Sequence, residues 1–398
     1  MKKHLLWLLL LGCVAGVVRA QDNKEAPGPY VFTDVNVLDI TPVKDQARSG
    51  TCWSFAGIGQ VESELLRRGK GVHDLSEMWI VRHAYFDKAV RYVRMQGKAN
   101  LGGGGTLNDV SYVIDRYGIV PEEAYPGLNY GTDRHVHAEM DAAIKAYADA
   151  IVTNPNKSIS TAWQNGLNGI LDAYLGSRPE KFTYRGKEYT PQSFAEELGL
   201  RPSDYVLVTS FTHHPFYRSF ALEVPDNWNG ALFYNVPLEE MERIIDNSLE
   251  KGYTVNWASD VSEKGFAYKK GFAVVPVASV EEMSDSEKGK WTTLSADELR
   301  KLSLDLSRIL PEKTITQAMR QQAFDSQETT DDHGMLIMGS ARDQQGDKFY
   351  KVKNSWGKDG VFGGCFYASA PFVMYKTTGI MVHKDAIPDD IRRKLDIR

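Results

Sequence analysis

The chain has 398 residues, of which 42% are hydrophobic and 25% charged, and its formal net charge at pH 7 is −5. No run of basic residues stands out from an ordinary solvated surface, so we do not expect a nucleic-acid partner. The length is large for one domain, yet no linker divides it.

The first twenty residues have the pattern of a secretory signal peptide, which is cleaved from the mature protein. Two lysines are followed by an apolar stretch over 5–18 and by Val18-Arg19-Ala20 as the cleavage site. The stretch of 14 residues is too short for a stable membrane span. We therefore expect an exported protein, periplasmic or secreted. Lipid attachment at Cys13 is the disfavoured alternative, because the residues after Cys13 stay apolar.

Cleavage after residue 20 removes three basic residues and no acids, which takes the net charge from −5 to −8. From there to residue 40, apolar positions alternate and predict an extended lead-in. Apolar residues at helical spacing then predict a helix that begins at Cys52 and that Gly69 ends. Ser76 is an N-cap for a second helix through Tyr85. A four-glycine loop over 102–105 precedes a short helix over 107–117.

The segment from about 130 to 290 mixes helical and extended patterns, and its residues 281–290 form a polar surface loop. The expected helices cover 141–150, 160–175, 191–197 and 238–251, and the expected strands cover 205–209, 231–234, 253–258 and 272–277. A helix over 311–324 then precedes strands over 335–340, 349–353, 366–368 and 379–382. Helices first and strands later predict an α+β fold with two lobes.

Four residues form a set suited to cysteine-based acyl transfer: Gln46, Cys52, His333 and Asn354. A thiol nucleophile needs a base to ionise it, and the base needs a third group to orient its ring. Cys52 follows a tight turn at the start of a helix, where the helix dipole favours the thiolate. The Gln46 amide and the Cys52 backbone N–H can bind an oxyanion. Each residue alone has a structural interpretation, but their joint occurrence favours catalysis.

These residues lie in three blocks that resemble the signatures of papain-like cysteine peptidases: Gln46–Phe55, Asp332-His333-Gly334 and Asn354-Ser355-Trp356-Gly357. Within that group the sequence is most similar to the bleomycin hydrolase and aminopeptidase C branch. The segments 117–121, 234–237 and 320–333 carry this likeness, which extends with gaps over most of residues 40–395.

The resemblance implies a papain-like fold over residues 21–398, with a helical lobe and an antiparallel β lobe. It implies Cys52 as nucleophile, His333 as general base and then acid, and Asn354 as the residue that orients the imidazole. Gln46 belongs in the oxyanion hole, and Trp356 lies at the cleft, where it shields the His333–Asn354 hydrogen bond from water. The separation of 333 − 52 = 281 residues exceeds the roughly 130–150 of ordinary papain-type enzymes, which matches an insertion at about 130–290.

Gly104 and Gly105 match the position where this family lines its substrate cleft with bare backbone. A flexible surface loop is the equally weighted alternative. His213 and His214 suggest a metal pair, but neighbours on a strand point to opposite faces and no nearby carboxylate or cysteine completes a site. We therefore expect no metal and no cofactor. Cys365 follows a glycine turn into a strand and is expected to be a buried free thiol.

In this branch a C-terminal arm lies in the cleft and restricts cutting to free N-termini, whereas this sequence ends at Arg398, just after a segment that resembles the helix before the arm. We expect either that another acidic group pairs with the substrate amine or that the cleft is open to internal bonds. The expected function is thus an exported cysteine aminopeptidase with peptide substrates. A broad-specificity endopeptidase is the alternative, and an inactive papain-like binding module is less favoured. The branch's hexamer leaves a homo-oligomer open for this chain.

Overall fold

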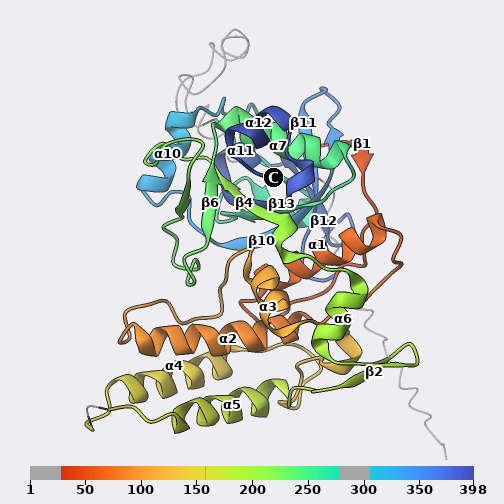
Figure 1. Cartoon of the computed structure of the whole chain (residues 1–398). Coiled ribbons are helices and arrows are strands. Elements are labelled where there is room, and N and C mark those ends of the chain that lie inside the picture. Colours follow the sequence, from red (N-terminus) through yellow and green to blue (C-terminus); the bar gives the residue numbers. More distant parts are fainter. Residues whose placement is uncertain (1–27, 157, 278–304) are drawn as a thin grey trace, which may run out of the picture.

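The computed structural model describes residues 28–156, 158–277 and 305–398, which form a helical lobe and a β lobe (Figure 1). The expected signal peptide and the polar loop over 281–290 lie outside these residues. No helix in the described ranges is long and apolar enough to cross a membrane.

The helical lobe begins with α1, whose first residue is Cys52, and contains a layer of three helices, α2, α4 and α5, packed side by side (Figure 1). Ser76 caps α2 by accepting a hydrogen bond from the backbone N–H of Trp79 at 2.9 Å, as its sequence predicts. The helices are α1 (Cys52–Arg67), α2 (Glu77–Arg94), α3 (Asp109–Tyr117), α4 (Ala138–Val152), α5 (Ala162–Leu175) and α6 (Pro191–Leu198). A small hairpin of β2 (Phe182–Tyr184) and β3 (Lys187–Tyr189) precedes α6.

The β lobe is built on an eleven-stranded sheet in the order β5-β6-β4-β13-β7-β10-β11-β12-β9-β8, with β1 added beside β10. All its pairs are antiparallel except β4–β6 and β9–β12. Its strands are β1 (Thr33–Val37), β4 (Tyr205–Thr209), β5 (Ser219–Ala221), β6 (Leu232–Asn235), β7 (Val255–Ser259), β8 (Phe266–Ala267), β9 (Phe272–Ala273), β10 (His333–Arg342), β11 (Lys348–Lys353), β12 (Cys365–Ser369) and β13 (Thr377–His383). Its helices are α7 (Leu238–Glu250), α10 (Gln317–Asp325), α11 (Ala370–Lys376) and α12 (Asp389–Lys394).

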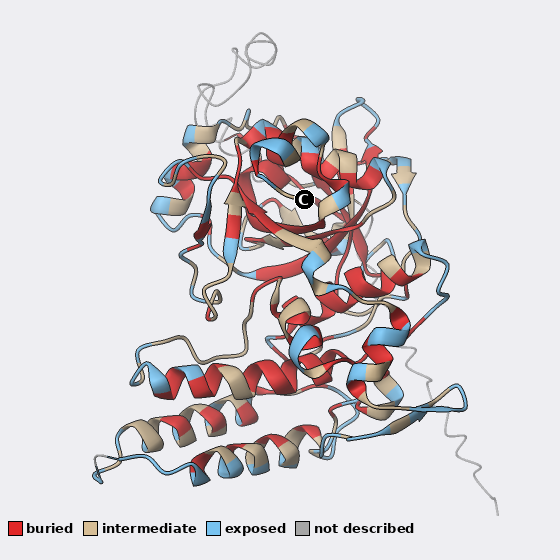
Figure 2. Ribbon diagram, viewed as in Figure 1, coloured by how far each residue is buried: buried red, intermediate tan, exposed pale blue. Residues whose placement is uncertain are grey.

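Helix α1 joins the two lobes, because it packs on α2 and α3 on one side and on β7 and β10 on the other. It is buried along most of its length (Figure 2). Gly57 permits this packing, since a Cβ there would lie 2.5 Å from Cγ2 of Val110 on α3. The N-terminus of α1 is therefore held against the start of β10, which brings Cys52 to the strand that begins with His333.

Most predicted elements are confirmed, and three corrections stand out. The helix expected over 311–324 begins at Gln317, because the backbone of Pro311 and Lys313 is bonded to Val277 and Val275 instead. The strand expected over 272–277 is confined to Phe272–Ala273. Helix α11 and the β2–β3 hairpin were not expected from sequence patterns.

The residues of the expected insertion do not pack as one unit. The part over 138–198 extends the helical lobe, whereas the part over 205–273 supplies strands to the sheet. Strand β7, near the end of this segment, pairs directly with β10. The sheet that carries His333 thus depends on residues from the middle of the chain.

Candidate active site

Cys52 is the first residue of α1; the residue as a whole is partly exposed, but its thiol is buried. Its Sγ accepts a hydrogen bond from the backbone N–H of Gly334, the residue after His333, at an N–Sγ distance of 3.3 Å. The turn before it is tight, because Gly50 packs on the backbone of Gly103. A Cβ placed on Gly50 would lie 3.3 Å from the Cα of Gly103. The thiol thus lies at a helix N-terminus, where partial positive charge favours a thiolate.

The ring of His333 is oriented by Asn354. Its Nε2 lies 2.7 Å from Oδ1 of Asn354, and the same oxygen accepts the backbone N–H of Ser355 at 2.8 Å. Two contacts on one amide atom fix that atom as the oxygen, which can only accept. Nε2 of His333 therefore carries the proton, and Nδ1 is the nitrogen that can take a proton from a thiol.

Trp356 covers the His333 ring. The two rings stack with centroids 4.7 Å apart and planes inclined by 30°. Tyr268 in turn packs edge-on against Trp356 at 5.0 Å. The resemblance places Trp356 in this position, against the ring of the histidine.

Gln46 joins the cysteine turn to the asparagine turn. Its Nε2 donates to the carbonyl of Ser49 at 2.8 Å, and its Oε1 accepts from Oγ of Ser355 at 2.6 Å. An amide nitrogen has two N–H groups, so one remains for another acceptor. The first N–H groups of a helix also have no partner within it, which leaves that of Cys52 available to an oxyanion. The structure thus brings Gln46, Cys52, His333 and Asn354 together.

Burial keeps the thiol and the imidazole neutral in this arrangement. It raises the pKa of Cys52 to about 12, and the charges of Asp331 and Asp226 act in the same direction, against the Gly334 N–H. Burial also lowers the pKa of His333 to about 4, against the bond to Asn354. Neither group ionises alone near neutral pH. The chemically useful step is transfer of one proton from Sγ to the ring, which creates both charges together.

The glycine loop lies beside this site and is held in place. Trp53 donates its indole N–H to the Gly103 carbonyl at 3.0 Å, and the buried Lys88 donates to the Gly102 carbonyl at 2.7 Å and to that of Gly104. Gly105 packs on the Trp53 ring, and a Cβ placed on Gly105 would lie 2.7 Å from Cε2 of Trp53. These contacts favour a fixed wall over the flexible surface loop that the sequence left as an alternative.

The sequence did not single out Asp226, which packs on Gly104 from the β lobe. A Cβ on Gly104 would lie 1.9 Å from Oδ2 of Asp226. Asp226 belongs to the β5–β6 loop, residues 222–231, whose run of proline, asparagine and glycine predicts a turn but says nothing about what it faces. Its proximity to the glycine loop is visible in the tertiary structure alone.

The reasoning against a metal at His213 and His214 is wrong in its geometry. Both residues lie in a bend after β4 and not on a strand, and their Nε2 atoms lie 3.1 Å and 2.9 Å from the carboxylate of Glu223. In the described part of the chain they form a cluster whose ligand atoms lie within 4.8 Å of one another. Two imidazoles and a carboxylate are ligand types that Zn²⁺ accepts. Here the groups satisfy one another by hydrogen bonds.

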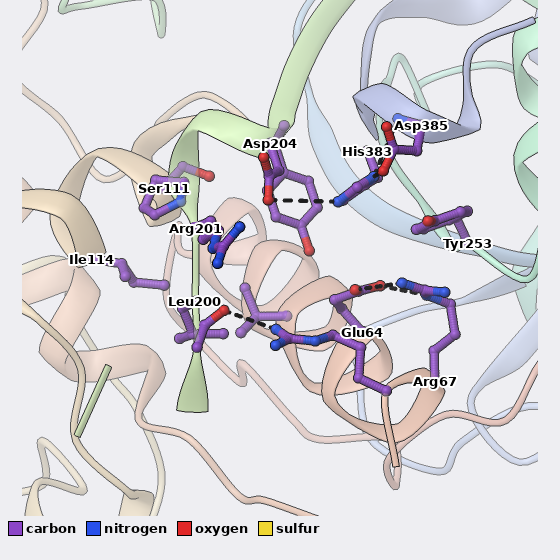
Figure 3. Close-up of a pocket in the computed structure, with 15 residues that line it drawn as sticks. Glu64, Arg67, Ser111, Ile114, Leu200, Arg201, Asp204, Tyr253, His383 and Asp385 are labelled. Atoms are coloured by element: carbon purple, nitrogen blue, oxygen red, sulfur yellow. Dashed lines mark hydrogen bonds and ion pairs between the residues drawn. The ribbon is translucent and has the colours of Figure 1, made fainter. Parts of the chain in front are cut away.

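A separate cavity of about 280 Å³ lies at the opposite end of α1 (Figure 3). Some of its polar groups pair within its own wall: Arg67 binds Glu64 at 2.7 Å, and the His383 ring lies 3.9 Å from Asp204. None of the predicted site residues lines it, so we assign it no part in the chemistry.

Cys365 begins β12, buried and free of any disulfide, as the sequence predicts. A cysteine at the N-terminus of a helical-lobe helix and a buried histidine with an asparagine partner in the β lobe together define the class of papain-like cysteine peptidases. The chain belongs to the Peptidase C1-like family, whose model matches residues 17–304 and 309–398. The predicted fold and enzyme class are thereby confirmed.

Relatives of this chain carry peptidase names. It is 25% identical over 392 residues to aminopeptidase C of Lactococcus lactis subsp. cremoris, covering 89% of this chain and 83% of that protein. It is 22% identical over 424 residues to the mitochondrial cysteine proteinase 1 of Saccharomyces cerevisiae (strain YJM789), covering 95% and 80%. The crystal structure of PepW from Lactobacillus rhamnosis matches with a TM-score of 0.68 at 20% identity, covering 92% of this chain and 84% of that one.

Proposed function

We propose that this protein is an exported cysteine aminopeptidase that removes residues from the free N-termini of peptides. The observation that carries the proposal is the contact of the β5–β6 loop with Gly104. An extended peptide that continued along the glycine wall, away from the scissile bond on its N-terminal side, would meet this loop. A substrate whose first residue lies against this loop would avoid the clash. The name of one relative, aminopeptidase C, agrees with a preference for such substrates.

The reaction follows from the geometry of the site. The Cys52 proton passes to Nδ1 of His333, and the thiolate attacks the carbonyl carbon of the first peptide bond. The second N–H of Gln46 and the backbone N–H of Cys52 donate to the oxyanion. The imidazolium then protonates the departing amine, a thioester remains on Cys52, and water, deprotonated by the neutral ring, hydrolyses it. Asn354 holds the ring in one orientation throughout.

The test compares an aminoacyl coumarin amide that has a free amine with its N-acetylated counterpart. We expect the wild-type protein to prefer the free amine in kcat/KM on the order of 10²-fold, the scale of a buried charge contact. The Cys52→Ala variant should cleave neither substrate while keeping its thermal midpoint. Equal or better cleavage of the acetylated compound would instead support an open endopeptidase cleft.

The export part of the proposal rests on the sequence of residues 1–20. Purified from the exported fraction of its host, the protein should have an intact mass that corresponds to a chain beginning at Gln21. A mass that includes the first twenty residues would contradict cleavage, and one with a lipid on Cys13 would support the alternative.

A further inference from the structure

The carboxylate of Asp226 faces the substrate wall from the β lobe. Its oxygens approach Gly104 so closely that no side chain fits there, and its Oδ1 accepts a hydrogen bond from Nδ2 of Asn100 at 2.9 Å. Asn100 lies just before the glycine loop, so one oxygen of Asp226 is bound to the helical lobe. The other oxygen, Oδ2, is the one nearest Gly104.

The loop that carries Asp226 is held from both ends. Within the β5–β6 loop, Nδ2 of Asn227 donates to the carbonyls of Leu222 and Ala231, both at 3.0 Å. Between the lobes, the indole N–H of Trp228 donates to Asp109 on α3 at 2.8 Å. The position of Asp226 is therefore set by both lobes, and a group bound to it would meet a preorganised carboxylate.

Burial raises the pKa of Asp226, and the nearby charge of Lys88 opposes that rise without forming an ion pair. Within the described ranges no cation forms an ion pair with Asp226, and the Nζ of Lys88 is occupied by the carbonyls of Gly102 and Gly104. Asp331 is a second acid of this region, and the two carboxylates repel each other and both oppose ionisation of Cys52. A positive charge placed between Asp226 and the nucleophile would relieve this repulsion and ease formation of the thiolate.

We propose that Asp226 binds the α-ammonium group of the first residue of the substrate, and that this contact sets the cut at the first peptide bond. The inference rests on the aminopeptidase function proposed above and names the residue that would enforce it. The ammonium group donates to Oδ2 of Asp226, while the backbone of Gly104 lies beside the same residue of the substrate. An acetylated amine loses the charge and adds atoms where the β5–β6 loop lies.

The experiment measures kcat/KM of the wild type, Asp226→Asn and Glu223→Gln on three substrates: the free-amine compound, its desamino analogue and its N-acetyl derivative. We expect Asp226→Asn to lose about 30- to 100-fold on the free amine, the scale of a lost buried charge contact, with less than a threefold change on the desamino analogue. Glu223→Gln removes an acid from the same loop that contacts His213 and His214 instead of Gly104. This control should stay within twofold on all three substrates.

The outcomes separate the two proposals. A wild type that prefers the acetylated substrate overturns the aminopeptidase function itself. A wild type that prefers the free amine, with Asp226→Asn retaining that preference in full, overturns the role of Asp226 and leaves the function standing. Should the thermal midpoint show that Asp226→Asn does not fold, Asp226→Ser, which is smaller beside Gly104, is measured in the same way. If Asp226→Ser keeps the full preference for the free amine, the proposed role of Asp226 is overturned as well.

Discussion

At the scale of single residues, the site depends on one buried imidazole. His333 is 5% exposed, bonded to Asn354 and covered by Trp356. Burial lowers the pKa of His333 to about 4, from about 6.5 in an unfolded chain. The ring is thus neutral at rest and able to take the thiol proton. The same shift makes the stability of the folded protein depend on pH.

The sign of this dependence follows from the depressed pKa. The unfolded chain binds the proton more readily, so the contribution of His333 to stability is present above pH 6.5 and is lost as the pH falls towards 4. Between pH 7 and pH 4.5 the loss amounts to about 2.5 kcal/mol of unfolding free energy from this residue. The His333→Gln variant can still donate to Asn354 but has no imidazole to titrate. Its unfolding free energy should therefore fall by about 2.5 kcal/mol less than that of the wild type between pH 7 and pH 4.5. Urea unfolding at both pH values measures this, and equal losses in the two proteins would contradict it.

At the scale of elements, the proposed substrate preference depends on how the β5–β6 loop is held against the helical lobe. Besides Trp228, Asn229 donates to Asp109, with Nδ2 3.2 Å from Oδ1. The Trp228 ring also packs edge-on against Tyr112 at 5.7 Å. These contacts hold a loop of the β lobe on α3 of the helical lobe, so weakening them should let the loop leave Gly104.

Trp228→Phe keeps a ring against Tyr112 and removes the indole N–H. Losing a hydrogen bond to a charged acceptor costs about 1.5–3 kcal/mol, which raises the open population of the loop about 10- to 100-fold. We expect cleavage of the N-acetylated substrate to increase several-fold or more, while cleavage of the free-amine substrate falls. Trp163→Phe, a buried tryptophan on α5 away from the cleft, is the matched control. An unchanged ratio between the substrates in Trp228→Phe would argue against the loop as the barrier.

At the scale of the whole molecule, a buried ionic network ties the N-terminal segment to both lobes. Nζ of Lys44 lies 3.3 Å from Glu62 on α1 and 2.7 Å from Glu77 on α2. Thr41 joins the network by donating to Glu62 at 2.5 Å and accepting from Lys353 on β11 at 3.1 Å. Burial raises the pKa of Glu77 to about 7, and the charge of Lys44 opposes this rise. Lys44 is therefore the cation that pairs directly with these buried acids, and Lys353 is a second cation near them.

Lys44→Met should destabilise the protein by about 3 kcal/mol, because it removes the cation that pairs directly with the buried Glu62 and Glu77. Urea unfolding at pH 7 measures the change. Lys181→Met, which breaks the solvent-exposed pair with Glu188, should leave the unfolding midpoint almost unchanged. Comparable destabilisation by both variants would contradict the importance of the buried network.

Local patterns predicted the elements whose formation depends on neighbours in the chain. The helical spacing after Cys52 and the cap at Ser76 place the starts of α1 and α2, although α2 continues to Arg94, nine residues beyond the predicted stretch. Local patterns failed where distant residues compete for the backbone. The carbonyl of Pro311 accepts from Val277, and α10 therefore begins later in the chain than the pattern predicts. They failed likewise at His213 and His214, which a bend after β4 turns towards the same carboxylate.

The sequence by itself determined the chemical type of this protein, because thiol-based acyl transfer requires a small set of side chains in recognisable local contexts. Gln46, Cys52, His333 and Asn354 could be named without coordinates for that reason. Only the tertiary structure decided that the acid beside Gly104 is Asp226. The approach of Asp226 to Gly104 depends on how the β5–β6 loop packs across two lobes, and no local pattern along the chain encodes that distance.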